Sequence, residues 1–125
     1  MASAIDQLRW PTQALAPPAS EQIRLFPSFV CIPDELALDF SQWFEVVSHS
    51  DDLSVEQRTA LERLDQTLGA FSGTAHTDAW IEEALHPHPA WRKFRQRAID
   101  VLVAFNWPRE GPPSNGSIYV GTPHA

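Results

Sequence analysis

Two stretches of the chain repeat apolar residues at intervals of three or four positions, with polar residues between them. The first stripe consists of Leu36, Phe40, Trp43 or Phe44, and Val47. The second consists of Leu61, Leu64, Leu68 and Phe71. This spacing places the apolar side chains on one face of an α-helix, so each stretch predicts a helix that packs against a neighbour.

The residues at the ends of these stretches are typical helix boundaries. Asp34 follows Pro33 and is a suitable N-cap for the first helix. Ser54 and Gln57 have the spacing of a capping box for the second helix, and Gly73 is a suitable stop. The polar run 48–52 is short, so the two helices are predicted to form an antiparallel hairpin.

The remaining helices are predicted from the prolines. Thr77 or Asp78 would cap a short helix that continues through Leu85. Prolines then alternate with histidines over 86–89, which interrupts the helix because a proline disfavours helical conformation in the residue before it. Pro89 suits the first position of a last helix, which ends at 107–108.

The two ends of the chain differ from this helical core. Residues 1–32 are predicted to be an irregular arm with short turns, because Pro11, Pro17 and Pro18 interrupt any long helix. Residues 108–125 are rich in proline and glycine, with one extended run at 117–120. The predicted fold is a single mainly α domain over 1–125, a small helical bundle built on antiparallel hairpins, with its core at 34–107.

Length and cysteine content agree with this simple organisation. The chain has 125 residues, a common size for one domain. Its single cysteine, Cys31, excludes an internal disulfide and is expected to be a small buried apolar residue. The first ten residues lack a basic run followed by an apolar one, and no apolar segment approaches the length of a bilayer span. We therefore expect a cytoplasmic protein without a membrane contact.

Negative charge is concentrated in the middle of the sequence. Residues 34–84 contain twelve acidic residues and two arginines, a net charge of −10, whereas the whole chain carries −7. Such a region repels phosphate backbones, which disfavours nucleic acid as a partner. It would attract a basic protein surface. The alternative is that these acids only form the water-exposed faces of the helices and keep the protein in solution.

The sequence offers little that would support catalysis. His86 and His88 could together bind one metal ion, but zinc needs a third or fourth ligand and none is evident. The alternative is a rigid turn between helices with His88 at or near an N-cap. Nucleophile and phosphate-loop motifs are absent from the sequence, so we expect a protein that binds a partner without enzymatic activity, cofactor or metal.

Many short runs, taken together, resemble small bacterial immunity proteins of contact-dependent and polymorphic toxin systems. The matching positions are 25–30, 34–40, Trp43, Leu61, Leu64, Asp65, Leu68, 71–73, Trp80, Ala84, Leu85, Trp91, Arg95, Ala98, Leu102, Phe105, Trp107 and Pro108. The resemblance extends over residues 25–120. It implies a protein that binds and neutralises a cognate toxin delivered by neighbouring cells, and it predicts this role more than an architecture.

The predicted function is accordingly inhibition of a toxin domain by direct contact. A nuclease with a basic active-site surface is one toxin that an acidic inhibitor would fit. The residues expected to make the contact are Glu45, Asp51, Asp52, Glu56, Glu82 and Glu83. Two alternatives are a helical adaptor or regulatory protein of another bacterial assembly and a small metal-dependent enzyme that uses His86 and His88.

Overall fold

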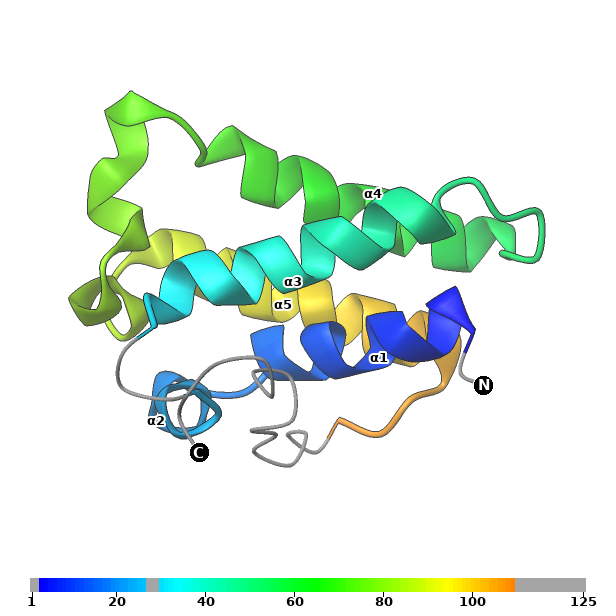
Figure 1. Ribbon diagram of the computed structural model, residues 1–125, viewed down its shortest axis with the longest axis horizontal. Coiled ribbons are helices and arrows are strands. Elements are labelled where there is room, and N and C mark those ends of the chain that lie inside the picture. The colour runs from blue at the N-terminus through cyan, green and yellow to red at the C-terminus, as the bar shows by residue number, and fades with distance from the viewer. Residues whose placement is uncertain (1–2, 27–29, 110–125) are drawn as a thin grey trace.

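The computed structural model describes residues 3–26 and 30–109 of the chain (Figure 1). Within them five α-helices occur: α1 (Ala4–Leu15), α2 (Ala19–Arg24), α3 (Ile32–Val47), α4 (Val55–Ala70) and α5 (Pro89–Phe105). Two 3-10 helices, η1 (Thr74–Trp80) and η2 (Glu82–Leu85), connect α4 to α5. The predicted mainly α fold is confirmed. The predicted extended run at 117–120 lies outside the described residues, as do positions 27–29 of the arm.

The four long helices run in alternating directions along one axis (Figure 1). Helices α3 and α4 are antiparallel neighbours, as predicted for the hairpin. Their closest packing, however, is with other helices: α3 lies mainly on α1, and α4 mainly on α5. Helix α1 also packs on α5. The core is therefore shared by α1 and α5 as much as by the hairpin.

Large side chains from all four long helices fill the core. Those with the largest volume and almost no exposure include Leu8 and Leu15 of α1, Leu36 and Phe40 of α3, Leu61 and Leu64 of α4, and Trp91, Phe94 and Leu102 of α5. The apolar stripes predicted from the sequence thus face inward, because burial of their side chains is the main stabilising contribution to a helical bundle.

The capping box that begins α4 is present as predicted. The Ser54 Oγ accepts a hydrogen bond from the Gln57 amide over 3.1 Å, and the Gln57 Oε1 accepts one from the Ser54 amide over 2.9 Å. Helix α4 ends at Ala70, and Gly73 has a φ of +100° that favours glycine. Both ends of this helix therefore follow from local sequence.

Helix α3 begins earlier than predicted. Cys31 is the N-cap, and Pro33 and Asp34 lie in the first turn. Proline suits this position because its fixed φ is helical and its missing N–H would have no intrahelical acceptor. The expectation that Cys31 is buried is wrong: the residue is exposed, because the N-cap lies where the chain enters the helix.

The arm at 1–32 contains more helix than its prolines suggest. Pro11 does not end α1, which continues to Leu15, although a proline inside a helix removes one hydrogen bond. Leu8, Pro11 and Leu15 are all buried against the bundle. We infer that this burial outweighs the loss. Pro17 and Pro18 do separate α1 from the short α2, so the arm remains interrupted.

The segment between α4 and α5 also differs from the prediction. Instead of one helix starting at Thr77 or Asp78, two 3-10 helices meet at Ile81, whose backbone is extended with a φ of −103° and a ψ of 154°. Two tryptophan side chains hold the first of them in place. The Trp80 Nε1 donates to the Phe71 carbonyl over 2.7 Å, and the Trp91 Nε1 donates to the Ala79 carbonyl over 2.8 Å.

Candidate functional site

Four of the six predicted contact residues lie together at one end of the bundle. Glu45 is in the last turn of α3, Asp51 and Asp52 are in the connection, and Glu56 is in the first turn of α4. All four are exposed. We call this group the acidic end; in Figure 1 it lies where α3 turns back into α4.

Arg58 holds the connection of the acidic end in a defined conformation. Its Nη1 donates a hydrogen bond to the Ser48 carbonyl over 2.9 Å, and its Nη2 donates to the Ser50 carbonyl over 2.6 Å. The Ser50 Oγ in turn accepts a hydrogen bond from the Asp52 amide over 3.1 Å. The loop that carries the two aspartates is therefore tied to α4 through backbone carbonyls, without neutralising their carboxylates.

The carboxylates of the acidic end have almost no internal counter-charge. Glu45 lies 3.8 Å from the His49 ring, but both side chains are nearly four-fifths exposed, so this pair contributes little. Among the described residues, Asp51, Asp52 and Glu56 form no ion pair. These charges are available to a partner.

The other two predicted residues are far from the acidic end. Glu82 and Glu83 are exposed on η2, at the opposite end of the bundle (Figure 1). Helices α3 and α4 have 16 residues each, which corresponds to a length of about 24 Å. The structure therefore separates the six acids into two groups.

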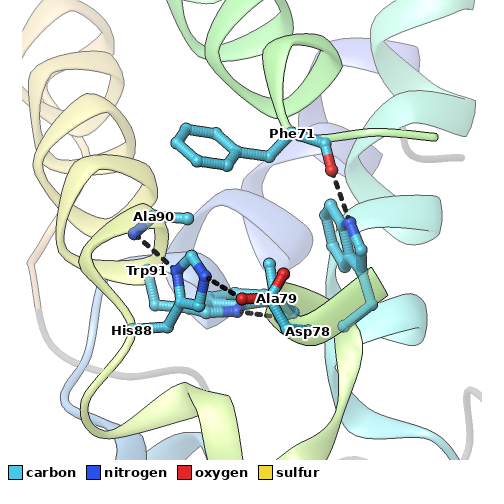
Figure 2. Close-up of polar contacts among 7 residues, drawn as sticks. Phe71, Asp78, Ala79, His88, Ala90 and Trp91 are labelled. Carbon is cyan, nitrogen blue, oxygen red and sulfur yellow. Dashed lines mark hydrogen bonds and ion pairs between the residues drawn. The ribbon is translucent and has the colours of Figure 1, made fainter. Parts of the chain in front are cut away.

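His88 is the N-cap of α5 (Figure 2). Its Nδ1 accepts a hydrogen bond from the Ala90 amide over 3.1 Å, and its Nε2 lies 3.2 Å from an Asp78 carboxylate oxygen. Both ring nitrogens thus have protein partners, whereas His86 is exposed. Across the described ranges, no group of three or more histidines, cysteines or acids is placed to hold a metal ion.

Two partly buried charged side chains were not identified from the sequence. Asp39 of α3 has a buried Oδ2 without a hydrogen-bond partner among the described residues. Its burial, and secondarily the charge of Glu35, raises the pKa of the Asp39 carboxyl to about 6. Arg95 of α5 is also partly buried, and this burial lowers the pKa of its guanidinium. The sequence pattern does not reveal that either charge is partly buried, since burial of a charge depends on which helix covers it.

No helix in the described part of the chain has the length and apolar character needed to cross a membrane. The chain matches no protein-family model, no curated protein and no solved structure.

Proposed function

We propose that the chain is an immunity protein that binds a cognate bacterial toxin domain and neutralises it by direct contact in the cytoplasm. The acidic end is the observation that supports this proposal most directly. It presents four exposed carboxylates, two on the turn between α3 and α4 and one on the adjoining end of each helix, at one end of the bundle. A basic protein surface is the complementary partner.

Both the charge of the turn and its ordered conformation contribute to affinity. A loop that must become ordered on binding loses conformational entropy, which reduces the net free energy of association. Because Arg58 already fixes the Ser48 and Ser50 carbonyls, this cost is reduced. Exposed acids would increase the association rate by steering a basic surface towards the turn.

Two of the six predicted contact residues are outside this central contact. Glu82 and Glu83 lie at the other end of the bundle and do not share the acidic end's surface. The proposed contact is therefore centred on Glu45, Asp51, Asp52 and Glu56, with the two η2 residues outside it.

A growth assay tests the proposed function. The C-terminal domain of the reading frame directly upstream would be expressed in a host cell with and without this chain. We expect that domain to arrest growth alone, co-expression to restore growth, and the two chains to co-purify. A harmless upstream domain, or arrest that persists despite good expression of this chain, would contradict the proposal and favour the adaptor alternative.

A further inference from the structure

A groove separates α3 from the C-terminal half of α4 and extends to η1. It has a volume of about 520 Å³. Its lining includes Asp34, Ala37 and Leu38 of α3, Asp65, Leu68 and Gly69 of α4, and Trp80 of η1. The groove exists because α3 and α4 pack mainly on α1 and α5 instead of on each other.

The apolar part of the groove is open to solvent, and its Trp80 ring is held in place by contacts with the bundle. Leu38 is 61% exposed. Trp80 is held by the hydrogen bond from its Nε1 to the Phe71 carbonyl and by stacking on Phe94 at 5.7 Å. A ring fixed in this way does not need to be ordered when a ligand packs on it, so this part of the groove is preorganised.

The polar part of the groove carries only negative charge. Asp34 and Asp65 are its charged lining residues, and neither forms an ion pair within the described residues. Burial, and secondarily the charge of Glu45, raises the pKa of the Asp65 carboxyl. A cation beside Asp65 would stabilise its charged form and so oppose this rise in pKa. The complementary ligand therefore combines an apolar side chain with a positive charge.

We propose that this α3–α4 groove receives a basic, apolar segment of the toxin domain. An aliphatic or aromatic side chain of that segment packs against Leu38, Leu68 and Trp80. A neighbouring lysine or arginine pairs with Asp34 or Asp65. The assignment of the segment to a toxin rests on the proposed function, whereas the chemistry of the groove does not.

Gly69 permits a test that leaves the fold intact. A Cβ at this position would meet no neighbouring atom within 4 Å, and the residue lies inside α4 with helical backbone. Gly69→Leu therefore adds a Cβ that meets no neighbour and extends a side chain from the lining of the groove, and it replaces a poor helix former. Ala70→Leu is the matched control, because Ala70 is exposed and does not line this groove.

The first measurement uses probes that do not depend on the toxin. Amide chemical shifts of the labelled chain would be followed while adding an amphipathic peptide made only of leucine and lysine, and separately one made of leucine and glutamate. We expect the lysine peptide alone to shift amides at 34–41 and 65–73. Gly69→Leu should abolish these shifts, and Ala70→Leu should retain them. Binding through charge alone would shift the acidic end and be unaffected by Gly69→Leu, and it would overturn the proposal.

The second measurement uses the toxin domain in the growth assay and in a binding titration. Gly69→Leu should melt at or above the temperature of the wild-type chain, yet bind the toxin domain at least about tenfold more weakly. Ala70→Leu should bind within about twofold of the wild type. If Gly69→Leu binds the toxin domain with full affinity, the proposed role of the groove is wrong, while the proposed function still stands. If the wild-type chain does not protect the host cell from the toxin domain, the proposed function is wrong. The peptide titration would still test whether the groove binds a basic, apolar segment.

Discussion

Arg95 of α5 donates a hydrogen bond from its Nη2 to the side-chain Oε1 of Gln22, which lies 73 positions earlier in the chain, over 3.1 Å. The same nitrogen donates to the Leu85 carbonyl. The Gln22 Nε2 donates to the carbonyls of Ala14 and Leu15 over 3.2 and 3.1 Å. Those carbonyls belong to the last turn of α1 and lack intrahelical partners. One partly buried pair thus joins α1, α2, η2 and α5.

Replacing Gln22 should destabilise the whole bundle. Gln22→Leu keeps a similar volume but removes the acceptor for Arg95 and the donor for the α1 carbonyls. Leaving the two α1 carbonyls without this donor costs about 1–3 kcal/mol. Urea unfolding would measure the loss. Gln7→Leu, at an exposed position of α1, is the control and should change the free energy of unfolding by less than about 0.5 kcal/mol. Equal effects at the two positions would show that the pair is unimportant.

Asp39 should make stability decrease as the pH rises. Its folded-state pKa of about 6 lies above the ordinary value, which is about 3.9 in an unfolded chain. The folded state therefore holds this proton more tightly, and the penalty for ionisation develops between about pH 4 and pH 6.

Asp39→Asn removes this penalty and should stabilise the chain at neutral pH. Solvent screening of a carboxyl that is only partly buried limits the gain to about 1 kcal/mol. The difference in unfolding free energy between Asp39→Asn and the wild type should be near zero at pH 4 and reach its full value above pH 6. Asp51→Asn, at an exposed position, corrects for the general effect of removing a carboxylate. A difference that does not vary with pH would contradict the assignment.

Arg58 should control the order of the acidic end. Arg58→Met removes both hydrogen bonds to the Ser48 and Ser50 carbonyls, and each such bond from a charged donor contributes about 1.5–3 kcal/mol when buried. This site is only partly buried, so we expect a loss of about 1–2 kcal/mol. Hydrogen exchange of the amides at 48–52 should accelerate. The control Arg63→Met changes an exposed residue of the same helix and should leave that exchange unchanged.

Charge reversal separates the two groups of acids by their effect on association with the toxin domain. Asp51→Lys with Asp52→Lys should slow association and weaken its dependence on salt, because steering acts through exposed charges. Glu82→Lys with Glu83→Lys makes the same change in net charge at the opposite end of the bundle. Stopped-flow association at several salt concentrations would compare the two. Equal slowing would mean that the acidic end has no special role in steering, because the end of the bundle that carries η2 and Trp80 would then contribute as much.

Much of the fold could be predicted because helix ends depend on residues close together in the chain. The capping box of Ser54 and Gln57, the stop near Gly73 and the His88–Pro89 start of the last helix all involve groups within about four positions. The apolar stripes of α3 and α4 follow equally from helical geometry.

The candidate site could be predicted only in part, for the same reason. Grouping Glu45, Asp51, Asp52 and Glu56 follows from a short connection between two antiparallel helices. Placing Glu82 and Glu83 required the path of η1 and η2, which depends on indole hydrogen bonds made with α4 and α5.

The sequence by itself determined where α3, α4 and α5 lie, which faces α3 and α4 bury and where negative charge collects, because these properties depend on local spacing. Only the tertiary structure decided that Pro11 remains inside a helix, that Gln22 meets Arg95, that Asp39 is partly buried, and that α3 and α4 leave a groove between them. Each of these depends on the free energy of contacts between segments distant in the chain, which no local pattern records.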